Sequence, residues 1–300
     1  MKDIDRLPPL FTSRGDLMSF FARHGKNNAR TNLLSMYEGE CYLGIDIGSY
    51  AIKSVLIGNH GQILNTYYEK PIVNQAIDII KFIKGMLSPK TKLVKCFVTG
   101  LFENANGYAD GFVEENSANL RAACFMVPTV DCVIEIGAKQ VEVIKRDREC
   151  NTITSEKRRM EQVGDMMVSA GEILKVSIES LATMAFFAST PFDFSIDKID
   201  TIEERIKYAI KNRYSVPDIS AGISYLIVET AIKEVLHTKD SDRLGKHIVV
   251  QGGTFDNKAV LRAFEKIFGI EVICPSISKF MGAYGAALIA KDNYSNQKRD

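Results

Sequence analysis

Three short loops carry residues whose types and spacing could bind a nucleotide. A backbone N–H of a glycine turn can donate to a phosphate oxygen, and a carboxylate can hold Mg²⁺ through water. Each loop follows an apolar run typical of a β-strand, and each contains glycine: Asp46-Ile47-Gly48-Ser49, Glu135-Ile136-Gly137-Ala138 and Gly252-Gly253-Thr254. The sequence therefore predicts a site for ATP or ADP with Mg²⁺, with two phosphate loops followed by a loop for the nucleoside.

Two acidic residues and one lysine supply the charge for this chemistry. Asp46 is the candidate ligand of Mg²⁺, through water, and Asp46 and Glu135 are the candidate catalytic carboxylates. Lys53 could contact phosphate or could be a solvated strand lysine, and Asp46 could be an ordinary turn residue. The remaining expected nucleotide contacts are small or hydroxyl residues: Gly48, Ser49, Gly137, Gly252, Gly253, Thr254 and Gly282.

Hydrophobic periodicity predicts the elements that position these loops. Strands are expected at 42–47, 52–58, 62–69, 95–100, 130–137, 139–147, 150–156, 247–253 and 271–274. Helices are expected at 16–25, 74–87, 115–126, 161–175, 178–188, 201–213, 218–236, 257–268 and 279–290. The turn Gly58-Asn59-His60-Gly61 is typical of a β-hairpin.

Strands followed by helices occur twice, which predicts a duplicated α/β domain of two lobes with a central cleft. We expect an N-terminal extension at 1–40, a first lobe at 41–130, a second lobe at 131–292 and a tail at 293–300. Ligands of open α/β sheets bind beyond the carboxyl ends of the strands. All three loops follow strands, so all three could face one cleft.

Composition limits the classes of partner. Hydrophobic residues make up 46% of the chain, charged residues 25%, and the net charge is +1. This balance gives no field that would favour nucleic acid or an anionic membrane. No apolar run approaches the length of a membrane-spanning helix, about 18 residues, and the N-terminus lacks the apolar core of a signal peptide. The expected location is therefore cytoplasmic.

Several other groups of residues have a structural interpretation beside a functional one. The basic run 157–159 could bind an anion or a partner, or form a solvated helix N-terminus. The phenylalanines Phe186, Phe187, Phe192 and Phe194 are expected in the core or at a dimer face. No two cysteines have C-x-x-C spacing, so we expect reduced and mostly buried thiols: Cys41, Cys96, Cys124, Cys132, Cys150 and Cys274.

Longer stretches of sequence resemble a known family. The segments PDISAGISYLIVETAI at 217–232, VVQGGTFDNKAVLRAFE at 249–265 and GAYGAALIA at 282–290 resemble the activator ATPases of 2-hydroxyacyl-CoA dehydratases and benzoyl-CoA reductases, the BadF/BadG/BcrA/BcrD type. They are most similar to the second activator repeat of long tandem activators. The resemblance implies an actin-like ATPase fold, shared with sugar kinases and the large heat-shock chaperones, and a dehydratase-type protein or a second copy of the chain as partner.

The resemblance also implies a [4Fe-4S] cluster in active members, with cysteines at two motif positions. Aligned on the family pattern, those positions fall on Arg159 and Lys198, and only Gly164 of the first motif is kept. A cationic side chain cannot ligate iron as a thiolate does. We therefore expect no iron-sulfur cluster.

The two phosphate loops depart unequally from the family pattern. The first keeps Asp46, Gly48, Ser49 and Lys53 but has Tyr50 in place of a small residue. The second has Ala138 and Gln140 where the resemblance implies a glycine and a carboxylate. These changes predict a degenerate, pseudoenzyme-like module that binds nucleotide but hydrolyses it poorly. The alternative is an active, cluster-free ATPase of the same family that serves as a conformational switch.

Overall fold

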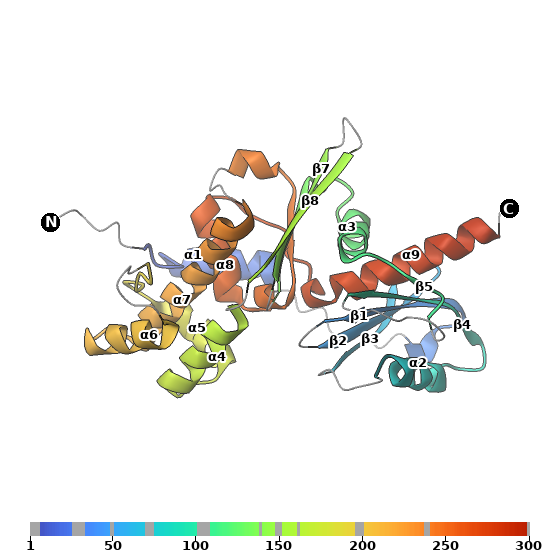
Figure 1. Ribbon diagram of the computed structural model, residues 1–300, viewed down its shortest axis with the longest axis horizontal. Coiled ribbons are helices and arrows are strands. Elements are labelled where there is room, and N and C mark those ends of the chain that lie inside the picture. Colours follow the sequence, from blue (N-terminus) through green and yellow to red (C-terminus); the bar gives the residue numbers. More distant parts are fainter. Residues whose placement is uncertain are drawn as a thin grey trace. The chain divides into compact units, whose positions relative to one another are not determined.

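The chain forms two compact units, which are described separately (Figure 1). The computed structural model describes residues 7–25, 34–48, 51–69, 75–100, 109–137, 140–147, 152–160, 163–195, 201–236 and 241–298. The β1 unit comprises Asn27–Val133 and Ile277–Asp300, and the β9 unit comprises Met1–Lys26 and Ile134–Ser276. Each unit is therefore built from two separate lengths of chain.

The β1 unit contains a five-stranded sheet in the order β3-β2-β1-β4-β5. Its strands are β1 (Gly39–Ile47), β2 (Ile52–Gly58), β3 (Ile63–Glu69), β4 (Thr91–Gly100) and β5 (Gly111–Phe112). Strand β1 pairs antiparallel with β2 and parallel with β4. The predicted hairpin joins β2 to β3, and its Gly61 has a φ of +78°, a conformation that glycine adopts without steric cost.

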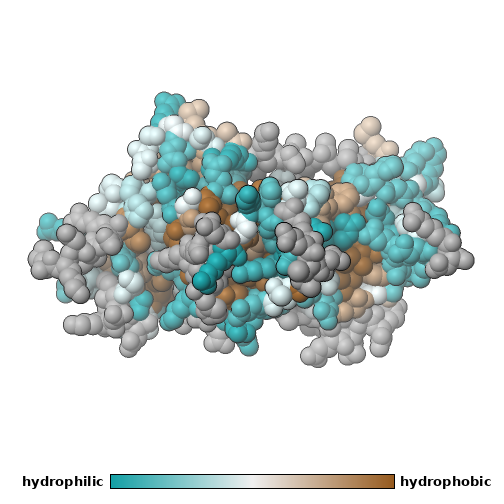
Figure 2. Space-filling model, turned by 90° about the horizontal axis from the view of Figure 1, so that it is seen from above, coloured by the Kyte–Doolittle hydropathy of each residue, from teal (hydrophilic) through white to brown (hydrophobic). Residues whose placement is uncertain are grey.

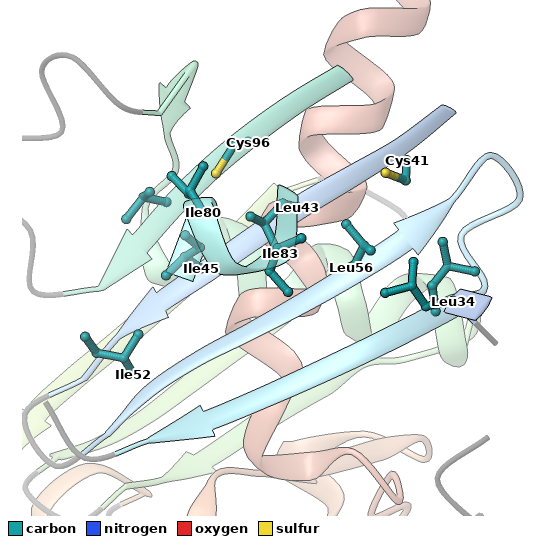
Figure 3. Packing of buried hydrophobic residues seen from close by; sticks show 11 residues of the cluster. Leu34, Cys41, Leu43, Ile45, Ile52, Leu56, Ile80, Ile83 and Cys96 are labelled. Atoms are coloured by element: carbon teal, nitrogen blue, oxygen red, sulfur yellow. The ribbon is translucent and has the colours of Figure 1, made fainter. Parts of the chain in front are cut away.

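Helices cover both faces of this sheet. They are α2 (Gln75–Met86), α3 (Glu115–Met126) and α9 (Met281–Gln297), and Figure 1 shows α2 and α9 on opposite faces. Successive side chains of a strand point to opposite faces. Leu43 and Ile45 accordingly join a buried cluster with Ile80 and Ile83 of α2 (Figure 3). The intervening even-numbered positions of β1, Asp46 among them, belong to the face that α9 covers.

The β9 unit contains a four-stranded sheet in the order β8-β7-β6-β9. Its strands are β6 (Cys132–Ile136), β7 (Gln140–Asp147), β8 (Thr152–Arg159) and β9 (Ile248–Gln251), so the unit boundary falls within β6. Strand β8 is at the edge and carries exposed Lys157, Arg158 and Arg159. Charged residues on an edge strand discourage pairing with other chains.

Helices make up the rest of the β9 unit. They are α1 (Arg14–His24), α4 (Val163–Leu174), α5 (Ile178–Met184), α6 (Ile202–Lys211), α7 (Val216–Ala231) and α8 (Lys258–Phe268), with 3-10 turns η2 (Ala185–Phe187) and η5 (Gly253–Asp256). A side chain caps the N-terminus of α7, where Ser215 accepts a hydrogen bond from the Asp218 N–H. Helix α8 is capped by Asn257 and ends at Gly269, whose φ is +64°.

Several elements end elsewhere than the sequence predicts. The basic run 157–159 lies on strand β8 and not at a helix start, because antiparallel pairing with β7 continues to Arg159, opposite Gln140, before α4 begins at Val163. Residues 271–274 do not form a strand; Ile273 makes one isolated bridge with Val249. The final helix continues to Gln297, so most of the expected tail is helical.

The division into units also differs from the expected one at both ends of the chain. Residues of the expected N-terminal extension pack into the β9 unit, where Leu10 and Phe20 are completely buried. The last helix, expected in the second lobe, belongs to the β1 unit. Sequence order suggested neither result, because both depend on contacts between distant parts of the chain.

The described cysteines and phenylalanines largely have the structural roles expected of them. Cys41, Cys96 and Cys132 are buried and Cys124 and Cys274 are half-buried, whereas Cys150 lies outside the described residues. Phe192 and Phe194 are buried with their ring centres 4.7 Å apart, and Phe187 is 70% exposed.

No helix in the described part of the chain is long and apolar enough to cross a membrane. Figure 2 shows hydrophilic residues over much of the face seen from above, with smaller hydrophobic areas between them.

Candidate functional site

The carboxylate of Asp46 lies at the carboxyl end of β1, where strand register brings it beside two other candidate residues. Asp46 is opposite Lys53 of β2 and opposite Thr99 of β4. The Lys53 Nζ lies 3.1 Å from the Asp46 Oδ2, and both side chains are largely buried, with exposed fractions of 18% and 12%. This ion pair excludes a freely solvated role for Lys53 and holds the carboxylate in one orientation.

Two glycines leave space around that carboxylate. Gly100, at the end of β4, has a φ of +95°, and a Cβ there would lie 2.4 Å from the Ile47 O and 3.0 Å from the Asp46 Oδ1. A Cβ on Gly282 would lie 3.2 Å from the Asp46 Oδ2 and 3.4 Å from the Asn119 Oδ1. A side chain at either position would therefore press against the acidic group.

Close packing fixes the first turn of α9 against this site. A Cβ on Gly44 would lie 1.9 Å from the Ala283 O, and a Cβ on Gly285 would lie 1.8 Å from the Ala118 O. Real Cβ atoms do not approach other atoms so closely, so α9 can touch β1 and α3 only because both positions are glycine. Gly285 thus lies close to the backbone of α3, and Gly282 is brought to Asp46.

The first loop begins with a tight turn in which the Gly48 N–H donates to the Ala51 O at 3.0 Å. Ser49 and Tyr50 lie outside the described residues, so the loop is characterised through Asp46, Gly48 and Lys53. These three residues are brought together with Gly282 within the β1 unit.

The second and third loops meet in the β9 unit, because β6 and β9 are neighbours in the sheet. The Gln251 Nε2 donates to the Glu135 Oε2 at 3.1 Å, and the Thr254 hydroxyl donates to the Gly137 O at 3.3 Å. Gly252 has a φ of +98°, and a Cβ there would lie 2.5 Å from the Ile136 O. The two loops are therefore cross-linked by side-chain hydrogen bonds.

The nucleoside loop has bare backbone at its centre. A Cβ on Gly253 would meet nothing within 4 Å among the described residues, whereas the neighbouring Phe255 is completely buried. The Gly137 N–H closes the second turn by donating to the Gln140 O at 2.8 Å. Ala138 lies outside the described residues.

Sequence reasoning missed three residues of these sites. Gln251 is 1% exposed, and its Oε1 is buried without a hydrogen-bond partner in the described part of the chain. Thr99 is completely buried, and its Oγ1 likewise has no such partner. Gly100 could have been found, since a strand running into glycine is the signal that identified the other loops.

The paired charges of Asp46 and Lys53 suit recognition of a charged group. No group of three or more His, Cys, Asp or Glu side chains in the described ranges is placed to hold a metal ion. Asp46 and Lys53 offer one negative and one positive charge beside bare backbone. Such a set can hold a hydrated Mg²⁺ and a phosphate oxygen, because Mg²⁺ keeps most of its waters when proteins bind it.

Known proteins with similar sequences were found over most of the chain. The 2-hydroxyisocaproyl-CoA dehydratase activator of Clostridioides difficile is 24% identical over 266 residues, 86% of this chain and 97% of that protein. The (R)-2-hydroxyglutaryl-CoA dehydratase activating ATPase of Acidaminococcus fermentans is 26% identical over 261 residues, covering 83% and 96%.

A solved structure has a similar fold. The activator of the 2-hydroxyisocaproyl-CoA dehydratase from Clostridium difficile, determined with bound ADPNP, superposes with a TM-score of 0.75 at 23% identity, covering 86% of this chain and 97% of that one. The likeness shows that the fold is that of the actin-like ATPases. The family model described as the BadF/BadG/BcrA/BcrD ATPase family matches residues 43–290, and the chain therefore belongs to that family.

Proposed function

We propose that this protein is a nucleotide-binding module of the dehydratase-activator type that binds ATP or ADP with Mg²⁺ but holds no [4Fe-4S] cluster. The observation that carries the proposal is the Asp46–Lys53 pair set among glycines at the end of β1. Asp46 would orient the hydrated Mg²⁺, and Lys53 with the Gly48 turn would contact phosphate. Gly252, Gly253 and Thr254 would receive the nucleoside.

The chemistry of the ligand positions argues against an iron-sulfur cluster. Arg159, which stands at the first cysteine position of the family pattern, is exposed at the end of β8. Lys198, at the second position, lies outside the described residues. Burial raises the pKa of Cys41 and Cys96 to about 12, which disfavours the thiolate that iron requires. These residue types support a module without the cluster, and the proposal therefore assigns the chain no electron-transfer role.

Hydrolysis is expected to be slow because the second loop keeps one carboxylate, Glu135, but lacks the second one of the family pattern. Gln140 occupies the position of that carboxylate in the family pattern, and it closes the turn through its backbone O. Ala138 adds a methyl group to the same loop. Poor placement of water and charge acts on the transition state more than on the bound nucleotide. Glu135 remains the candidate catalytic residue of this loop.

The alternative is an active, cluster-free ATPase of this family that uses hydrolysis as a switch. The intact Gly252–Thr254 loop and the paired Asp46 favour it as strongly as they favour simple binding. Measured phosphate release separates the two proposals, because only the second requires turnover.

The proposed partner is a dehydratase-type protein or a second copy of the chain. The relatives described above are named as activators of 2-hydroxyacyl-CoA dehydratases, which supports a partner of that class. The balanced net charge of +1 gives no reason to propose nucleic acid or a membrane.

Calorimetric titration with Mg-ADP and Mg-ATP tests the nucleotide proposal. Asp46→Ala should weaken binding about tenfold, since it removes a charge-assisted contact worth about 1.4 kcal/mol or more. Asp78→Ala is the matched control, because Asp78 is an acid of the same unit whose side chain is 69% exposed. The proposal fails if wild-type protein binds neither nucleotide at millimolar concentration, or if the two variants bind equally well.

A further inference from the structure

Residues 8–24 precede the part of the chain that matches the family model, yet they form an integral part of the β9 unit. We call them the docked segment. Backbone oxygens at its start are held by side chains of two helices: the Tyr225 hydroxyl of α7 donates to the Pro8 O at 2.8 Å, and the Arg262 Nε of α8 donates to the Leu10 O at 3.0 Å. Figure 1 shows α1 beside α8.

Aromatic side chains make the apolar part of this attachment. The Phe11 ring packs edge-on against Phe20 and Phe186, with ring centres 5.3 and 5.5 Å apart, and Phe21 packs against Phe186 at 5.4 Å. The guanidinium of Arg262 lies 5.0 Å from the centre of the Phe11 ring and 5.6 Å from that of Phe20. Contacts of this kind stabilise most when they are shielded from water.

Contacts between charged and polar side chains make the polar part. The His24 Nε2 lies 3.0 Å from the Glu265 Oε1, and these side chains are only 3% and 1% exposed. Arg262 pairs with both Asp16 and Glu265, and Arg23 also reaches Glu265 at 3.2 Å. Burial raises the pKa of Glu265. The hydrogen bonds from His24 and Arg262, together with nearby charges, lower it by more, so the pKa of this carboxyl is below its ordinary value. Glu265 is thus a carboxylate that connects α1 to α8.

Helix α8 connects the docked segment to the nucleoside loop. The helix begins directly after η5, the turn that contains Gly253 and Thr254, and Asn257 caps it. Phe255 of η5 packs against Phe264 with ring centres 5.9 Å apart, and both side chains are completely buried. Phe264 stands in sequence between Arg262 and Glu265, the residues that hold the docked segment. One rigid helix therefore contacts the segment and the loop.

We propose that residues 8–24 are an intramolecular ligand whose docking on α8 orders the Gly252–Thr254 loop and so strengthens nucleotide binding there. Only the effect on nucleotide rests on the proposed function; the ordering of the loop does not. Coupling of this kind is reciprocal, so bound nucleotide must also strengthen docking of the segment. The surface of η2, α7 and α8 is then a binding site for an aromatic helix, occupied here by the chain itself.

Amide hydrogen exchange of the full-length, nucleotide-free protein tests the coupling. Phe20→Ala empties a completely buried position on α1, whereas Met18→Ala changes a residue of the same helix that is 63% exposed and serves as the control. In the Phe20→Ala protein, exchange should accelerate about tenfold or more over residues 14–24 and severalfold over residues 253–268, with residues 41–57 of the β1 unit unchanged. Acceleration of residues 14–24 without any change at 253–268 would overturn the proposal.

A second variant and a ligand experiment complete the test. Asp16→Asn weakens docking more gently and replaces Phe20→Ala if that protein does not fold; the same two regions should respond together. Mg-ADP should slow exchange over residues 14–24 of wild-type protein. If calorimetry shows binding but this region does not respond, the coupling to nucleotide is wrong. If no nucleotide binds yet Phe20→Ala still accelerates residues 253–268, the proposed nucleotide function fails while ordering of the loop stands.

Discussion

The ends of β1 and β6 are built alike but hold their carboxylates differently. In both, an acidic residue is followed by isoleucine and a glycine whose N–H closes a turn, at 3.0 Å for Gly48 and 2.8 Å for Gly137. In both, a glycine at or directly after the end of a neighbouring strand has a positive φ and lies against the isoleucine carbonyl: Gly100 in the β1 unit and Gly252 in the β9 unit.

The partner of each carboxylate marks the difference. Asp46 is paired with the cation of Lys53, whereas Glu135 accepts a hydrogen bond from the neutral amide of Gln251. The Lys53 cation could contact a phosphate as well as Asp46, and Mg²⁺ could take its place beside the Asp46 carboxylate. The Gln251 amide carries no charge and orients the Glu135 carboxylate. The comparison teaches that similar strand ends can orient a carboxylate in different ways: Asp46 through a cation of the adjacent strand β2, and Glu135 with an amide donor from the neighbouring strand β9.

The largest expected effect is on the rate of ATP turnover, when the second loop is changed to the family pattern. Ala138→Gly with Gln140→Asp restores room for backbone donors and adds a carboxylate, and should raise ATP turnover about 10²-fold if the defect lies in this loop. Steady-state phosphate release measures the change. If the double variant has an unchanged rate, the slow turnover is due to Tyr50, Glu135 or a missing partner. A wild-type rate of about one per second or faster would favour the active, switch-like ATPase.

Removing each carboxylate's partner should affect stability unequally. Lys53→Met leaves a largely buried Asp46 without its lysine and should cost about 1–3 kcal/mol of unfolding free energy. Gln251→Leu removes an amide donor to the Glu135 carboxylate, which costs stability, and also removes an amide oxygen that is buried without a partner in the described chain, which offsets part of that cost. The net cost should therefore be below about 1 kcal/mol. Denaturant midpoints measure both.

The control for this pair is Lys81→Met, which changes a lysine of the β1 unit whose side chain is 74% exposed. Equal losses for Lys53→Met and Gln251→Leu would remove the distinction between a charged and a neutral partner.

Low pH should reduce amide exchange protection in one unit before the other, and this is the smallest of the expected effects. The pKa of Glu265 is lowered in the folded state, so its contribution is complete above the unfolded pKa of about 4.3 and is lost as pH falls through the folded value. Exchange protection of residues 14–24 should therefore decline below about pH 4 before that of residues 41–57. Glu265→Gln keeps the shape but cannot titrate, and should reduce the decline, with the remainder due to Asp16, whose pKa is also lowered. A decline of unchanged size in this variant would assign it to groups other than Glu265.

The sequence predicted the local elements well and the contacts between them poorly. Strand β2 and helix α3 have the predicted bounds, because their patterns and flanking turns act over a few residues. The basic run at Lys157–Arg159 suggested a solvated helix start, yet it continues an edge strand where both faces tolerate charge. The pairing of Gln251 with Glu135 depends on β9 lying next to β6, which no local pattern encodes.

In the candidate sites, too, local features could be predicted from the sequence and contacts between distant residues could not. Spacing located Asp46, Glu135 and Gly252, because strand-end glycine loops have a recognisable pattern. It did not show that Lys53 pairs with Asp46 rather than with solvent, since that follows from strand register. Docking of α1 on α8 joins residues more than two hundred positions apart, as in the His24–Glu265 pair, and could not be predicted from either segment alone.

The place of α9 in the β1 unit has a consequence for how the protein is made. Ribosomes deliver the strands of this sheet first and its covering helix last, after the whole of Ile134–Ser276 has been synthesised. The even-numbered face of β1, including Gly44 and Asp46, must therefore wait for Met281–Gln297 before it is shielded. Contacts so distant in sequence slow folding and leave apolar surface exposed to aggregation in the meantime. A nascent chain arrested before Met281 should accordingly bind chaperones that recognise apolar strands, and release them once the final helix emerges.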